Sequence, residues 1–73
     1  MSLVVAIGEE RLLAGFALAG VDVRGAESPE AVVDAWERLG REVGLVLLTP
    51  PAEAALAERC SEREDLVWVS LPG

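Results

Sequence analysis

The side chains that could carry chemistry lie where two apolar segments of the sequence end. Glu9 and Glu10 follow the segment LVVAI, and Thr49 ends the segment GLVLLT. The chain has no histidine, lysine or tyrosine, and its six cations are all arginines. Without histidine, neither a Ser-His-Asp nor a Cys-His nucleophile can be assembled. Acid-base work would fall to carboxylates and the one cysteine. The sequence therefore predicts a protein that is not an enzyme.

The sequence also offers little to hold a metal ion or a cofactor. Cys60 has no second cysteine with which to form a disulfide or a metal cluster, and we expect it to be a small buried side chain on a helix. The turn GEERLLAG lacks both the G-x-G-x-x-G pattern and a phosphate-binding lysine. Its two glutamates would repel phosphate. We therefore expect no cofactor and no metal.

The charge of the chain limits its partners. The net charge is −7, and the arginines form no basic stripe. Nucleic acid and anionic membrane surfaces would therefore be repelled. The apolar run near the N-terminus stops at Gly8, which is too short for a signal peptide or a membrane span. We expect a cytoplasmic protein that does not bind nucleic acid and does not insert into a membrane.

Apolar patterning predicts the element order β-α-β-α-β-α-β within one domain, residues 1–73. Continuous or alternating apolar segments predict strands at residues 3–7, 21–25, 44–49 and 66–71. Helical spacing predicts helices over 10–19, from 29 and from 50. Such alternation implies a parallel sheet covered by helices. Right-handed crossovers then favour the strand order 2-1-3-4, a short flavodoxin- or Rossmann-like α/β sheet.

Residues typical of helix ends support these boundaries. Ser28 precedes Pro29, and Thr49 precedes Pro50, which are pairings of an N-cap with a first helical residue. Gly20 is expected to form a left-handed C-terminal cap. The spacing predicts a buried stripe on the second helix and another on the third: Val32, Val33, Trp36, Leu39 and Val43, then Ala52, Ala55, Leu56 and Cys60. Glu37 and Arg41 are expected to pair one turn apart.

The acidic pair invites comparison with a signalling domain. Glu9 and Glu10 resemble the acidic pair of phosphoacceptor receiver domains, which share this sheet order. Receivers also have an aspartate after the third strand and a lysine near a fifth strand. Thr49 occupies the first place, and the sequence has no lysine and no predicted fifth strand. We expect the two glutamates to lie in solvent at a helix N-terminus, where the helix dipole favours them.

A more extensive resemblance begins at the segment GFALAG. The chain resembles the F subunit of the rotary V/A-type ATPases, a small Rossmann-like protein of the central stalk. The similar residues are Ile7-Gly8-Glu9, then Gly15, Phe16, Leu18, Ala19, Gly20 and Val21, then the segment GLVLLT that ends at Thr49, and the final VWVSLPG. The resemblance covers nearly all of the chain. Glu9 stands where the family usually has aspartate.

The resemblance implies a structural part of a rotary ATPase, peripheral to the membrane through the complex. Such a protein docks on the long coiled coil of the D subunit, the rotor subunit, near the catalytic head. It has no cofactor, and it helps couple ATP hydrolysis or synthesis to proton or sodium transport. The chain ends at Gly73, before the C-terminal segment that the family usually has, so we expect a short form. The alternative is a stand-alone receiver-like or ligand-sensing α/β signalling module.

Gly15 is unexpected in the middle of a predicted helix. A glycine there costs about 1 kcal/mol relative to alanine. Either the helix packs closely on its own sheet at this point, or it contacts a partner. We expect the first arrangement, in which Gly15→Ala is destabilising, and the second stays open.

The predicted sheet has more area than three helices can cover. Strands lie about 4.8 Å apart, and a helix is about 10 Å wide. In the order 2-1-3-4 the first helix is alone on its face, which leaves that face of the third and fourth strands bare. Trp68 is expected on one side of the last strand, with Val67 and Val69 on the other. We expect this bare face to bind a partner, or to form a symmetric homodimer when the chain is isolated.

Overall fold

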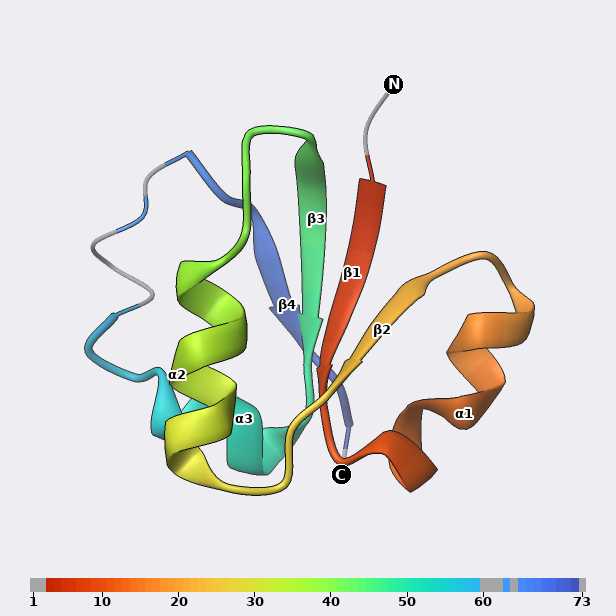
Figure 1. Cartoon of the computed structure of the whole chain (residues 1–73), viewed down its shortest axis with the longest axis horizontal. Coiled ribbons are helices and arrows are strands. Elements are labelled where there is room, and N and C mark those ends of the chain that lie inside the picture. Colours follow the sequence, from red (N-terminus) through yellow and green to blue (C-terminus); the bar gives the residue numbers. More distant parts are fainter. Residues whose placement is uncertain (1–2, 60–62, 64, 73) are drawn as a thin grey trace.

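The computed structural model describes residues 3–59, 63 and 65–72. Within them, four parallel strands form one sheet in the order β2-β1-β3-β4, which confirms the predicted topology. The seven elements follow one another in the predicted order (Figure 1). Their bounds are β1 Leu3–Gly8, α1 Glu10–Leu18, β2 Asp22–Gly25, α2 Pro29–Glu37, β3 Val43–Leu48, α3 Pro50–Ala55 and β4 Trp68–Ser70.

The two apolar strands β1 and β3 form the centre of the sheet. Val5 lies beside Val46 and Ile7 beside Leu48, and all four side chains are inaccessible to solvent. The sheet edges are β2 and β4. An ion pair of 2.8 Å joins Asp22 and Arg24 on β2, so that edge is charged.

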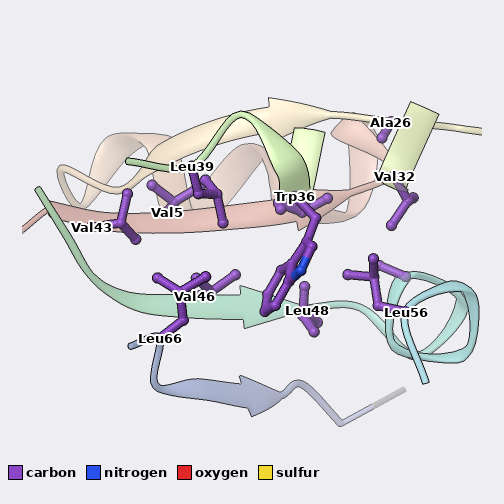
Figure 2. Close-up of a cluster of buried hydrophobic side chains, with 12 residues drawn as sticks. Val5, Ala26, Val32, Trp36, Leu39, Val43, Val46, Leu48, Leu56 and Leu66 are labelled. Carbon is purple, nitrogen blue, oxygen red and sulfur yellow. The ribbon is translucent and has the colours of Figure 1, made fainter. Parts of the chain in front are cut away.

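The main core lies between the sheet and helices α2 and α3. Trp36 of α2 is almost fully buried and points toward the strands among valine and leucine side chains (Figure 2). Leu56 comes from the end of α3, and Leu66 precedes β4. At about 25 cal/mol per Å² of apolar surface, burial of these side chains is the main stabilising contribution.

Helix α1 is alone on the opposite face, where it packs chiefly on β1 and β2 (Figure 1). Leu13 is its fully buried side chain. Gly20 has φ of 90° and ends the helix as predicted. The Gly20 amide donates to the Ala17 carbonyl at 3.2 Å, and the Val21 amide donates to the Phe16 carbonyl at 3.1 Å. These two bonds form a Schellman cap.

The predicted N-caps of the other two helices are present. The Ser28 hydroxyl accepts a hydrogen bond from the Ala31 amide at 3.1 Å. The Thr49 hydroxyl accepts one from the Ala52 amide at 3.3 Å. Each bond satisfies an amide that has no partner within its own helix.

Two helices end earlier than predicted. Helix α2 ends at Glu37, so Val43 belongs to β3 and Arg41 is not on the helix. The predicted Glu37–Arg41 helical pair is therefore wrong, and the ion pair one turn apart joins Asp34 and Arg38 at 3.0 Å. The Leu39 amide bonds the Trp36 carbonyl at 3.2 Å in a tightened last turn, just before Gly40.

Helix α3 ends at Ala55, before the predicted inner position 60. The Leu56 amide bonds both the Ala52 and the Glu53 carbonyls at 3.1 Å, and the Arg59 amide bonds the Leu56 carbonyl at 2.9 Å. Bonds across three residues replace the α-helical pattern here. Cys60, expected to be buried, lies outside the described residues. Strand β4 is also shorter than its apolar segment.

Candidate docking surface

The carboxyl ends of β1 and β3 meet in a tight contact at the centre of the crevice. Thr49 is 2% exposed, and its amide donates to the Ile7 carbonyl at 3.3 Å. A Cβ at Gly8 would lie 2.9 Å from the Cβ of Thr49, and nearer still to its methyl group. Gly8 therefore lets the two strand ends approach each other. The structure brings these two family-motif residues together in a structural role.

The two glutamates of the crevice do not form a cluster. Glu9 is at the N-cap position of α1 without a side-chain capping bond, and its carboxylate pairs with Arg11 at 3.0 Å. The Glu10 carboxylate instead lies beside Gly25, 3.2 Å from where a Cβ of that glycine would be. Among the described residues, no group of three His, Cys, Asp or Glu side chains could hold a metal ion.

A polar hollow of 390 Å³ opens from this crevice on the side of α2 and α3. Glu9, Glu27 and the Ser28 hydroxyl lie on its walls. The hydroxyl is already used to cap α2, and the two carboxylates make the hollow acidic. Such walls disfavour an anionic ligand such as a phosphate.

An apolar hollow of 500 Å³ opens on the side of α1. Its walls come from the first two turns of α1, from the N-cap and first turn of α3, and from the chain after β4. They are formed by Leu12, Phe16, Thr49, Pro50, Pro51, Leu71 and Pro72. None of these described residues carries a charge.

On the same side of the sheet as this hollow, β3 and β4 are only partly covered. Because Val46 and Leu48 point into the core beneath α2 and α3, Leu45 and Leu47 point to the α1 side. Leu47 lies beside Val69 in the sheet register, so Val69 and Val67 share that side. Val67 is 62% exposed and Val69 is 47% exposed. We call this surface the slot: Leu45, Leu47, Val67 and Val69, with Leu12 and Phe16 as its wall.

Trp68 lies on the other side of β4. It is beside Val46 in the register and is 36% exposed. The alternation along β4 therefore agrees with the pattern of the sequence, and both sides of this edge strand are apolar. An edge strand that faced water on one side would alternate with polar residues.

The expected close packing at Gly15 is wrong. Apart from its two sequence neighbours and the backbone of its own helix, no described atom lies within 4 Å of where its Cβ would be. Leu13 points to the sheet, and Gly15 is about 200° further round the helix. It is therefore exposed, as is Leu18 of the same helix, which is 92% exposed. A contact with a partner is the explanation that stays open.

The hollow and the slot include residues that the sequence did not single out as site candidates. Leu12 and Leu71 line the hollow, and Leu47 forms the floor. A signal was present for Leu12, which is one turn before Phe16 on the same side of the helix. Leu47 alternates with core residues in a run that is apolar throughout, and such a run does not reveal which positions stay uncovered.

A membrane crossing requires about 20 apolar residues in one helix. No helix in the described part of the chain has the length and apolar character for this.

Comparisons with known proteins agree on one family. No curated protein matches this chain. Among solved structures, the V-type ATP synthase F subunit of Archaeoglobus fulgidus is similar over 93% of this chain and 96% of that chain, with 25% sequence identity and a TM-score of 0.51. The family model of the ATP synthase (F/14-kDa) subunit matches residues 4–70. That match covers the sheet and all three helices, so this chain belongs to the ATP synthase (F/14-kDa) subunit family.

Proposed function

We propose that this chain is a non-catalytic central-stalk component of a V/A-type rotary ATPase or ATP synthase. It docks on the coiled-coil rotor subunit, the D subunit, near the catalytic head. Through the stalk it helps couple ATP hydrolysis or synthesis to proton or sodium transport. The family match over residues 4–70 carries the proposal.

The chemistry of the chain supports an accessory role. The sequence has no histidine and no lysine. The two glutamates of the crevice have different neighbours, because Glu9 pairs with Arg11 and Glu10 lies beside Gly25. The buried hydroxyl of Thr49 caps a helix and is not free to act as a nucleophile. A protein of this kind works through its surfaces, on the cytoplasmic side and peripheral to the membrane through the complex.

The proposal is tested by co-expression with the coiled-coil rotor subunit and the head subunits of the same organism. We expect a stable complex that survives size-exclusion chromatography, and no micromolar binding of ATP to the isolated chain in calorimetry. If the chain elutes alone while the other subunits assemble, the proposal fails. If nucleotides or acyl phosphates raise its melting temperature as well, the ligand-sensing alternative is the better explanation.

A further inference from the structure

The slot has the width and the apolar character of a binding surface for one helix of another chain. We propose that one helix of the partner's coiled coil lies in the slot beside α1 and covers the bare half of the sheet. This inference rests on the proposed function, because it takes the coiled-coil rotor subunit as the occupant.

The width of the slot matches a single helix. Strands β3 and β4 together span about 10 Å, the width of one helix with its side chains. Helix α1 forms a wall on one side, and on the other side β4 is the edge strand of the described sheet. One helix of a coiled coil can therefore enter while the second helix stays outside.

The distribution of charge favours an apolar stripe on a partner of opposite net charge. Three segments border the slot, residues 12–21, 43–51 and 66–72, and none of them contains a charged residue. The net charge of −7 attracts a basic partner. A second copy would bring another −7 and would be repelled, which is why we choose a partner helix over a homodimer.

Gly15 provides an independent argument for the same occupant. It lies one turn from Leu12, which forms the wall of the slot. The glycine weakens α1, and no described atom of its own chain uses the space that it leaves. A helix in the slot would run beside this part of α1, where a missing side chain allows the two backbones to approach closely.

Paired substitutions on one strand test the location of the interface. Val69→Glu places a charge in the slot, whereas Ser70→Glu places the same charge on the neighbouring residue, which faces the opposite side of β4. Both positions are exposed, so both variants should fold. Affinity for the purified rotor subunit is measured by calorimetry. We expect Val69→Glu to weaken binding about tenfold or more, and Ser70→Glu to bind like the unmodified chain.

A substitution on α1 separates docking from folding. Gly15→Gln puts a good helix former at an exposed position, so we expect its melting temperature to rise. Its longer side chain would occupy the space reserved for the partner, so we expect affinity for the rotor subunit to fall about tenfold or more. A merely structural glycine would not give this combination.

The outcomes distinguish the inference from the function on which it rests. If the unmodified chain binds the rotor subunit and the slot variants bind equally well, the slot is not the interface and the inference is overturned, while the stalk function stands. If the unmodified chain does not bind the rotor subunit, the proposed function fails and the inference fails with it. If sedimentation shows a dimer that Val69→Glu dissolves and the rotor subunit does not displace, a second copy is the occupant, which also overturns the inference.

Discussion

Replacement of Gly15 by alanine is the sharpest test of how α1 is built. The residue is exposed in the helix interior and does not have a positive φ. Apart from its two sequence neighbours and the backbone of its own helix, an added methyl group would meet no described atom within 4 Å. The change therefore gains the helix propensity of alanine over glycine, about 1 kcal/mol, with no overpacking to subtract. In a domain of this size that free energy corresponds to a rise in melting temperature of about 4–8 °C.

The assay is thermal unfolding followed by circular dichroism, at low protein concentration so that association does not contribute. Ala14→Gly is the matched control, because Ala14 is the exposed neighbour in the same helix. It should lose about 1 kcal/mol. The double variant, which only exchanges the two residues, should melt close to the unmodified chain. A fall in melting temperature for Gly15→Ala would refute the exposed position of Gly15 and restore the close packing that the sequence had suggested.

Three further outcomes follow from particular contacts. Ser28→Ala removes the N-cap of α2 and should lower the free energy of unfolding in urea by about 1 kcal/mol. Gly8→Ala places a methyl group against Thr49, at a φ of 155°, and should cost about 1–3 kcal/mol or more in the same assay. The hydrogen bond from Arg63 lowers the pKa of the Asp65 carboxyl, so NMR titration should give a midpoint below the ordinary value, and Arg63→Gln should raise that midpoint toward it. The small stabilisation from this exposed pair is present above the ordinary aspartate pKa and is lost as the pH falls through the lowered value.

The topology could be predicted because both the apolar runs and the residues at the helix ends indicate it. The apolar run that became β1 is buried on both faces from Val5 to Gly8, as a central parallel strand must be, and the run that became β3 buries Val46 and Leu48 on the side of α2 and α3. Ser28 and Thr49 mark helix starts because each hydroxyl accepts a hydrogen bond from the amide three residues later in the chain. This local bond depends little on the rest of the fold. Gly20 marks a helix end for a similar local reason.

The helix C-termini and the environment of Gly15 could not be predicted with the same security. Apolar spacing continues past Glu37 as far as Val43 even though the backbone leaves the helix, because a turn and a strand also place apolar residues in the core. The glycine in α1 shows a different limit. A glycine at this position indicates that a side chain would be disfavoured there. It does not indicate whether the atoms that a side chain would contact belong to the same chain or to another. That question needed the position of Gly15 relative to Leu13 and the sheet.

The two faces of the sheet have different roles: one holds the main core, and the other is partly exposed. The side with α2 and α3 holds Trp36 and the main core, and it accounts for most of the buried apolar surface. The side with α1 is incomplete: the helix is held by Leu13, carries a glycine that weakens it, and leaves Val67 and Val69 in water. A partner helix in the slot would supply the missing apolar contacts and would bind only the folded chain. Its binding free energy would then add to the stability of the domain. The same features that make the α1 side weak in isolation suit it to assembly.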